Sequence, residues 1–292
     1  MTTNEWNELA TDENKPMYNR YLASYAPGSS FKPITGAIGL STGKFTETED
    51  FGTSGLKWQQ DSTWKDFFVT TLTTYQGPAN LQNALIYSDN IYFAKAALKI
   101  GAESFAQSLD KIGFNNKIPF TQELTQSTYS NTNQFTSQTQ LANSGYRQAE
   151  MLVNPVHMAM IYSSFVNDGN MVQPYLEHKE VAKASYYKEQ AFTKEAANTI
   201  KEDLIQVIEN PNGTAHDAKI EGKLLAGKTG TAEIKASKND TEGTEIGWFN
   251  AFTVEENSKN PMLVISMVEN VKGKGGSHYL LPKVKEIFQS IE

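Results

Sequence analysis

Apolar residues recur at helical spacing through the middle of the chain, at positions i, i+3 and i+4, with polar residues between them. The first of these stretches follows a turn signal, Ala26-Pro27-Gly28, and Asn154-Pro155 provides a cap and a first residue for a later one. Gly43 and Gly113 are placed to end helices. The helices predicted from this pattern cover residues 29–40, 80–100, 102–112, 154–167 and 193–209.

The period changes towards the end of the chain, where β-branched and aromatic residues form short runs. These runs predict three strands, at residues 228–236, 246–255 and 261–270, with a hairpin loop at 238–243 and a final helix from Pro282. Residues 1–25, 44–78 and 115–143 show no clear period and are predicted to be irregular. Helices followed by an antiparallel meander indicate the α+β class.

Composition narrows the possible functions. The chain has 292 residues, of which 39% are hydrophobic, so it can bury the core of one large domain or of two smaller ones. A net charge of −7 disfavours nucleic-acid binding, and no run of about 18 apolar residues suggests a membrane span. The chain has no cysteine, which excludes disulfides, zinc thiolates and thiol nucleophiles. Its four histidines are far apart in sequence, so a metal site is not expected. No cofactor is expected either.

Two familiar motifs match the sequence but lack the required context. Gly39-Leu40-Ser41-Thr42-Gly43 fits the Gly-x-Ser-x-Gly nucleophile elbow, which needs a strand before the serine and a helix after it. Here a helix precedes the serine, so the segment is interpreted as a helix C-terminus. Residues 222–229 fit the phosphate-binding P-loop, but a predicted strand follows where a helix is required, so nucleotide binding is rejected.

Three short motifs become informative when they are taken together. Ser-x-x-Lys occurs six times, but only Ser29 follows a Pro-Gly turn and opens an apolar helix. Ser88-Asp89-Asn90 interrupts a helical pattern, and Lys228-Thr229-Gly230 is the one Lys-Thr-Gly in the chain. In this order the three motifs are the signatures of serine β-lactamases and penicillin-binding proteins.

The chain resembles the transpeptidase domain of penicillin-binding proteins at these motifs and their flanks, and most of all the low-affinity, resistance-type class B enzymes of Gram-positive bacteria. The flanking matches are residues 25–33, 55–59, 83–94, 228–233 and 247–249. The resemblance implies the penicillin-binding-protein and serine β-lactamase-like fold, an antiparallel sheet flanked by helices plus a mostly helical subdomain. A single transpeptidase domain is then expected over 1–292, mostly helical at roughly 40–215, with the meander and C-terminal helix at 216–292.

The resemblance also implies roles for individual residues. Ser29 would be the nucleophile, Lys32 its base and Ser88 a proton relay to the leaving amine. Lys32 lies one helical turn after Ser29 and can take the proton only when it is neutral. The remaining assignments are Asn90 to the substrate amide, Lys228 and Thr229 to the substrate carboxylate, and the N–H groups of Ser29 and Thr231 to an oxyanion hole. Gly230 would also belong to the substrate-binding residues. The implied ligands are D-Ala-D-Ala-ended stem peptides of peptidoglycan and β-lactams.

Two features depart from the family pattern. Residues 145–149 read Gly-Tyr-Arg-Gln-Ala where the family usually has Gly-Tyr-Gly-Gln-Gly, so Arg147 and Ala149 replace small residues near the cleft. Only 28 residues precede Ser29, where the family has two more strands, a non-catalytic domain and a membrane anchor. We therefore expect an open edge on the strand near 261–270. Other cell-wall synthesis proteins would bind the missing upstream region, and the full-length protein would act on the extracytoplasmic face of the membrane.

Other functions share the same motifs. A class A β-lactamase needs a deacylating glutamate in Glu-x-x-Leu-Asn, and Glu150-Met151-Leu152-Val153-Asn154 nearly matches. Pro155 follows at once, as in a helix cap, and Glu150 lies 150 − 29 = 121 residues after the serine. A serine β-lactamase, a D,D-carboxypeptidase and a β-lactam sensor domain remain alternatives to a D,D-transpeptidase.

Overall fold

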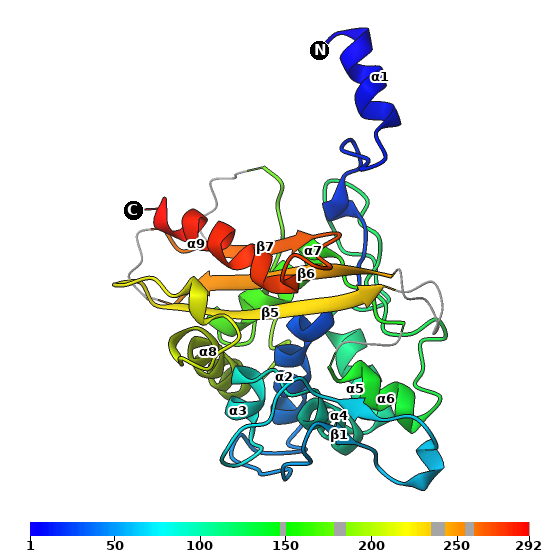
Figure 1. Cartoon of the computed structure of the whole chain (residues 1–292), viewed down its shortest axis with the longest axis vertical. Coiled ribbons are helices and arrows are strands. Elements are labelled where there is room, and N and C mark those ends of the chain that lie inside the picture. Colours follow the sequence, from blue (N-terminus) through cyan, green and yellow to red (C-terminus); the bar gives the residue numbers. More distant parts are fainter. Residues whose placement is uncertain (147–149, 178–184, 235–242, 255–259, 292) are drawn as a thin grey trace.

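A three-stranded antiparallel sheet crosses the molecule, with helices on both of its faces (Figure 1). The computed structural model describes residues 1–146, 150–177, 185–234, 243–254 and 260–291. The sheet contains β5 (Leu225–Ile234), β6 (Thr244–Thr253) and β7 (Leu263–Val268) in the order β5-β6-β7. The three predicted strands are therefore confirmed. The 238–243 hairpin loop lies outside the described residues except for Gly243.

The helix α2 (Lys32–Ser41) runs through the centre of the helical layer and packs against α4 (Asn90–Ile100) and α8 (Lys194–Glu209). It begins as a 3-10 turn over Gly28–Phe31, and Pro33 occupies its first turn, where a missing N–H costs little. Residues 32–39 of α2 are all buried. The predicted helix at 29–40 is confirmed, and Gly43 follows it with a left-handed φ of +64°.

The other predicted helices are also present. The 80–100 segment divides into α3 (Leu81–Ile86) and α4, with the break at Ser88 and Asp89, as expected from the sequence. Then follow α5 (Ala102–Lys111), α7 (Pro155–Ser163) and, after the strands, α9 (Leu281–Gln289), which covers the sheet face opposite α2 and α8 (Figure 1). Asn154 caps α7, since its side-chain oxygen accepts the N–H of Val156 at 2.9 Å.

The structure corrects three segments that were predicted to be irregular. The N-terminal region contains α1 (Thr3–Thr11), and residues 115–143 include most of α6 (Gln138–Ser144). Within 44–78, β1 (Lys57–Trp58) pairs with β2 (Val69–Thr70). A further small pair, β3 (Met171–Val172) with β4 (Tyr186–Lys188), follows α7.

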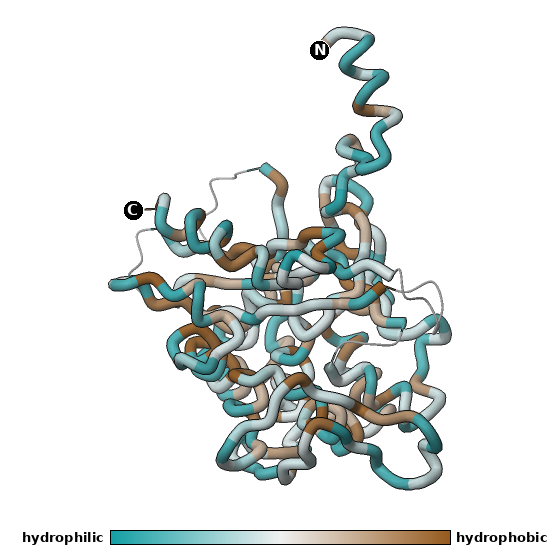
Figure 2. The backbone as a smooth tube through the Cα atoms, in the orientation of Figure 1, coloured by the Kyte–Doolittle hydropathy of each residue, from teal (hydrophilic) through white to brown (hydrophobic). Residues whose placement is uncertain are grey.

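The helix α1 projects away from the body of the molecule, and its tube is mostly hydrophilic (Figures 1 and 2). It has no buried residue. A capping box starts it, because Thr2 accepts the Glu5 N–H while the Glu5 carboxylate accepts the Thr2 N–H at 2.6 Å. The hydrogen bonds of this capping box, and not tertiary packing, stabilise the helix.

The strand β7 lies at one side of the sheet. Its inner side pairs with β6 from Gly247↔Val268 to Phe252↔Leu263. Within the described residues no strand pairs with its outer side. Arg20 approaches this side from the N-terminal segment and forms an ion pair with Glu269 at 2.7 Å. Of the helices in the described part of the chain, none is long and apolar enough to cross a membrane.

Candidate active site

Two glycines hold the chain around Ser29 against the strand β5. Gly28 has a φ of +57°, and a Cβ there would lie 2.6 Å from the carbonyl oxygen of Thr231. A Cβ on Gly230 would likewise lie 2.6 Å from the N atom of Ser30. Backbone contact on this scale excludes any side chain. The residues on both sides of Ser29 therefore touch β5, which places the half-buried Ser29 beside the Lys-Thr-Gly motif.

Two longer side chains fix the same turn from other elements. Tyr162 of α7 donates its hydroxyl to the carbonyl oxygen of Ser30 at 2.7 Å. Trp248 of β6 is fully buried and donates its indole N–H to the carbonyl oxygen of Ala26 at 2.9 Å. A buried Tyr or Trp usually needs such a partner, and here each partner belongs to the segment that carries Ser29.

Lys32 occupies the base of the site. Its side chain is fully buried, and its Nζ donates to the hydroxyl oxygen of Ser88 at 2.9 Å and to the Ser88 carbonyl oxygen. The ring of Phe93 lies 5.9 Å from the Lys32 Nζ. The Ser-x-x-Lys and Ser-x-Asn motifs, 56 residues apart, thus meet in space.

Ser88 projects from a tight turn between α3 and α4. It has a φ of +54°, which is uncommon for a residue with a side chain. Asp89 stabilises the turn by capping α4, since its Oδ1 accepts the Ile91 N–H at 2.8 Å. Its other oxygen accepts the Tyr75 hydroxyl at 2.9 Å, and the Tyr75 ring stacks on Tyr87 with centroids 4.6 Å apart.

Asn90 follows the turn at the start of α4. It is buried, and its amide nitrogen donates to the carbonyl oxygen of Thr70 at 2.7 Å. Thr70 lies on β2, in the segment that was predicted to be irregular. This hydrogen bond fixes the direction of the Asn90 side chain and ties the β1–β2 pair to the site.

Lys228 approaches Ser88 from the strand β5. Its side chain is fully buried, and its Nζ lies 3.1 Å from the Ser88 Oγ and 3.2 Å from the Thr229 carbonyl oxygen. Burial lowers the pKa of Lys228 from its ordinary value of 10.5 to about 7. Two lysine amines therefore meet at one hydroxyl group, an arrangement that disfavours a positive charge on both.

Thr229 makes a contact that the motifs do not predict. Its hydroxyl donates to the hydroxyl of Thr214 at 2.9 Å, and the Lys228 Nζ lies 3.5 Å from the same Thr214 oxygen. Thr231, the last predicted site residue, accepts the Ser277 N–H at 3.1 Å through its hydroxyl. Thr214 carries no recognisable motif, and its position depends on how α8 connects to β5.

The structure also decides the competing sequence patterns. Residues 222–229 lead into β5 and not into a helix, so they do not form a P-loop. Gly39–Gly43 is the C-terminal end of α2. Glu150, the glutamate of the segment that resembles the β-lactamase pattern, accepts the Asn131 N–H at 2.7 Å through its carboxylate. Arg147 and Ala149, which depart from the usual family loop, lie outside the described residues.

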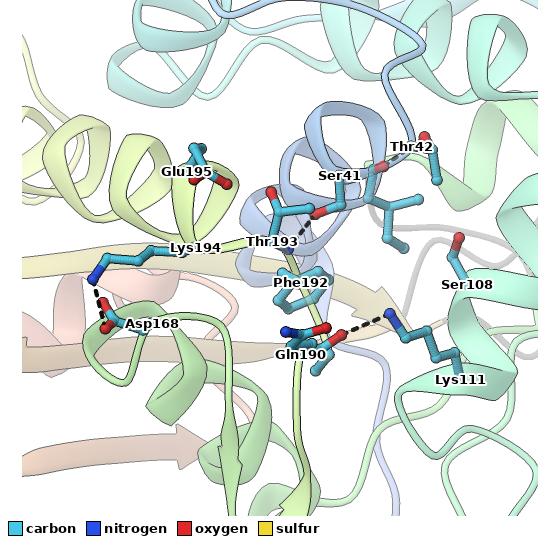
Figure 3. Close-up of a pocket in the computed structure, with 12 residues that line it drawn as sticks. Ser41, Thr42, Ser108, Lys111, Asp168, Gln190, Phe192, Thr193, Lys194 and Glu195 are labelled. Atoms are coloured by element: carbon cyan, nitrogen blue, oxygen red, sulfur yellow. Dashed lines mark hydrogen bonds and ion pairs between the residues drawn. The ribbon is translucent and has the colours of Figure 1, made fainter.

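A pocket of about 430 Å³ lies at the C-terminal end of α2, roughly 15 Å of helix away from Ser29 (Figure 3). It is bordered by hydroxyl groups and by two lysines, of which Lys111 donates to the Gln190 carbonyl at 2.6 Å and Lys194 pairs with Asp168 at 2.8 Å. It contains none of the predicted site residues. No group of three or more metal-ligating side chains occurs among the described residues.

The family model described as "Penicillin binding protein transpeptidase domain" matches residues 2–291. The chain belongs to this family. "Penicillin-binding protein 3" of Bacillus subtilis is 40% identical over 286 residues, which are 98% of this chain and 42% of that protein. "Peptidoglycan D,D-transpeptidase PbpA" of Mycolicibacterium smegmatis is 26% identical over 277 residues, which are 89% of this chain and 53% of that protein. The transpeptidase chain thus spans about half the length of these relatives or less.

Solved structures confirm the predicted fold. The imipenem acyl-enzyme complex of penicillin-binding protein A from M. tuberculosis superposes with a TM-score of 0.75 at 22% identity, covering 91% of this chain and 60% of that one. The transpeptidase domain structure from Eggerthella lenta has a TM-score of 0.74 at 22% identity, covering 99% and 72%. The α+β penicillin-binding-protein fold that the motifs implied is therefore present.

Proposed function

We propose that the chain is a peptidoglycan D,D-transpeptidase that forms an acyl-enzyme on Ser29. The observation that carries this proposal is the meeting of Lys32 and Lys228 at the Ser88 hydroxyl, beside a serine held against β5. A nucleophile, a buried amine and a relay hydroxyl are the three parts that a serine acyltransferase needs. The family membership supports the same chemistry.

The reaction proceeds in two steps. Ser29 Oγ attacks the carbonyl carbon between the two D-alanines, and its proton passes to neutral Lys32. The N–H groups of Ser29 and Thr231 stabilise the resulting oxyanion, and each such donor is worth roughly 2.7–4 kcal/mol. Ser88 delivers the proton to the departing amine as the C–N bond breaks. The amine of a second strand then attacks the ester, which forms the new amide and frees Ser29.

Burial of the side chain is the cause of the lowered pKa of Lys228. A substrate carboxylate near its Nζ favours the charged form, because an opposite charge stabilises the ammonium. Lys228 therefore takes up a proton when the donor peptide binds, and it holds the carboxylate in place during acylation. Since peptidoglycan lies outside the membrane, we place this reaction on the extracytoplasmic side.

Intact-mass spectrometry with benzylpenicillin tests the acylation step. We expect a stable adduct with the mass of the whole drug, mapped to Ser29 and absent in Ser29→Ala. Ser41→Ala is the matched control, because Ser41 lies at the opposite end of α2 and should label like the unmodified protein. No adduct at millimolar drug would refute the assignment of Ser29.

The fate of the adduct separates the alternatives. An adduct that disappears within minutes while drug is consumed would indicate a β-lactamase. With a D-Ala-D-Ala-ended peptide and an added amine acceptor, we expect the transfer product. Hydrolysis alone would indicate a D,D-carboxypeptidase, and a stable acyl-enzyme with no product would indicate a sensor domain.

A further inference from the structure

Thr214 lies in the connection between α8 and β5, next to the side chain of Lys228. Its N–H donates to the carbonyl oxygen of Ile86 at 3.2 Å, two residues before Ser88. Gly213 before it has no room for a side chain, since a Cβ would lie 2.1 Å from the carbonyl oxygen of Val207. The backbone at Thr214 is therefore held between the end of α3 and the last turns of α8.

The Thr214 hydroxyl contacts the two groups that were assigned to the substrate carboxylate. It accepts the hydroxyl hydrogen of Thr229 at 2.9 Å, and it lies 3.5 Å from the Lys228 Nζ. A hydroxyl group offers one hydrogen and two lone pairs. Both contacts use the oxygen of Thr214, so its own hydrogen remains available to turn towards Thr229.

We infer that Thr214 is a positioning residue that makes acylation selective for donors whose leaving group carries a carboxylate. This inference rests on the proposed function. When a carboxylate binds, the Thr229 hydroxyl turns to donate to it, and Thr214 reverses its hydrogen bond to donate to Thr229. A chain of two hydroxyl groups then ends on the anion, and hydrogen bonds in such a chain strengthen one another.

The role of Thr214 is confined to one half of the reaction. In acylation Ser29 Oγ bonds to the acyl carbon, and the leaving group departs with its carboxylate and a proton. The acyl-enzyme that remains has lost the carboxylate, so deacylation proceeds without it. A general loss of structure would slow both steps, whereas the loss of a carboxylate contact slows acylation alone.

Two thioester donors with the same acyl group measure this selectivity. One is an N-acyl-D-alanyl thioester of thioglycolate, and the other is the matching thioester of thioglycolamide, which has no carboxylate. Both yield the same acyl-enzyme as the C–S bond breaks. The variants are Thr214→Val, which removes the hydroxyl at nearly constant shape, and Thr214→Ser, which keeps it. Thr199→Val on α8 is the control, because its hydroxyl donates to Glu47 at 3.1 Å outside the site.

For Thr214→Val we expect kcat/KM to fall about 10-fold or more with the thioglycolate ester and less than about twofold with the thioglycolamide ester. Deacylation of the common acyl-enzyme should keep its rate, and Thr214→Ser and Thr199→Val should behave like the unmodified protein. Equal losses with both donors, or no loss in Thr214→Val, would overturn the inference. If the unmodified protein forms no acyl-enzyme with either thioester or with penicillin, the proposed function itself fails.

Discussion

At the scale of single residues, the buried amine of Lys228 makes the free energy of unfolding depend on pH. The unfolded chain has an ordinary lysine pKa of 10.5 at this position, and the folded chain has a pKa of about 7. Between these two pH values the unfolded state binds more protons, so the free energy of unfolding rises with pH across this window. Below pH 7 folding buries the charged ammonium group, and the full free-energy cost of burying that charge opposes folding.

Replacing Lys228 by Met removes this titration. We expect the free energy of unfolding of the wild-type chain to gain about 1–3 kcal/mol relative to Lys228→Met between pH 7 and pH 9. Urea unfolding of both proteins at several pH values measures the difference. Parallel pH profiles would contradict a lowered lysine pKa in the fold.

Gly28 and Gly43 both have positive φ, yet they differ in the space around them. A Cβ at Gly28 would overlap the backbone of β5, whereas nothing lies within 4 Å of a Cβ at Gly43. Gly43→Ala should therefore cost only the backbone strain, about 1–2 kcal/mol. Gly28→Ala should cost about 1–3 kcal/mol more and abolish acylation by penicillin, because the Ser29 turn must move off β5.

Urea unfolding and penicillin labelling of the two glycine variants provide the comparison. If Gly28→Ala were labelled at the normal rate, the close contact with β5 would not be needed to hold Ser29. If Gly43→Ala lost labelling as well, the strain at the far end of α2 would have to reach the site.

At the scale of secondary-structure elements, the turn between α3 and α4 depends on the cap of Asp89. Asp89→Ala should destabilise the protein by about 0.5–2 kcal/mol and slow acylation, because Ser88 and Asn90 lie on either side of the cap. Thr193 caps α8 near the opposite end of α2, where its N–H donates to Ser41 Oγ at 3.0 Å. Thr193→Ala should cost a similar free energy and leave the acylation rate unchanged.

Stopped-flow acylation, measured together with urea unfolding, separates these two effects. Equal acylation rates in Asp89→Ala and Thr193→Ala would mean that the α3–α4 turn keeps its shape without its cap.

Prediction of elements from the sequence succeeded where apolar side chains face the core at a regular period. It failed for α1, a short helix whose large apolar side chains, Trp6 and Leu9, are exposed. The capping box of Thr2 and Glu5 was present in the sequence and was the available signal. The helix α6 was missed because it is short and rich in Gln, Asn and Ser, although Ser137 caps it.

At the scale of the whole molecule, a large cluster of buried side chains extends from the helical layer through the sheet to α9, and a smaller cluster contains Tyr25, Ile246 and Trp248. Residues 1–19 belong to neither cluster. Removing Thr2–Thr11 should change the melting temperature by less than about 2 °C, because α1 contributes no buried side chain. Differential scanning calorimetry measures this, with penicillin labelling as the functional control. A larger drop would show that α1 packs on the body in solution.

The candidate site could be predicted from the sequence only in part. Ser29, Ser88 and Lys228 belong to motifs whose local spacing is recognisable, and the structure brings Ser88 and Lys228 to hydrogen-bond distance and places Ser29 beside β5. Thr214 and the partner of Asn90 on β2 could not be predicted, because each contact depends on how distant elements pack. The roles of all these residues stay predictions until acylation is measured.

The glycine contacts between the Ser29 turn and β5 also limit how this site can evolve. Backbone atoms set the separation of these two segments, so no exchange of side chains at Gly28 or Gly230 can increase that separation by small steps. The α3–α4 turn is held instead by the Asp89 cap, the stacking of Tyr75 on Tyr87 and the hydrogen bond from Tyr75 to Asp89. Single substitutions can weaken each of these interactions gradually. Selection that reshapes this site can therefore act gradually at Tyr75, Tyr87 and Asp89, but only in large steps at the two glycines.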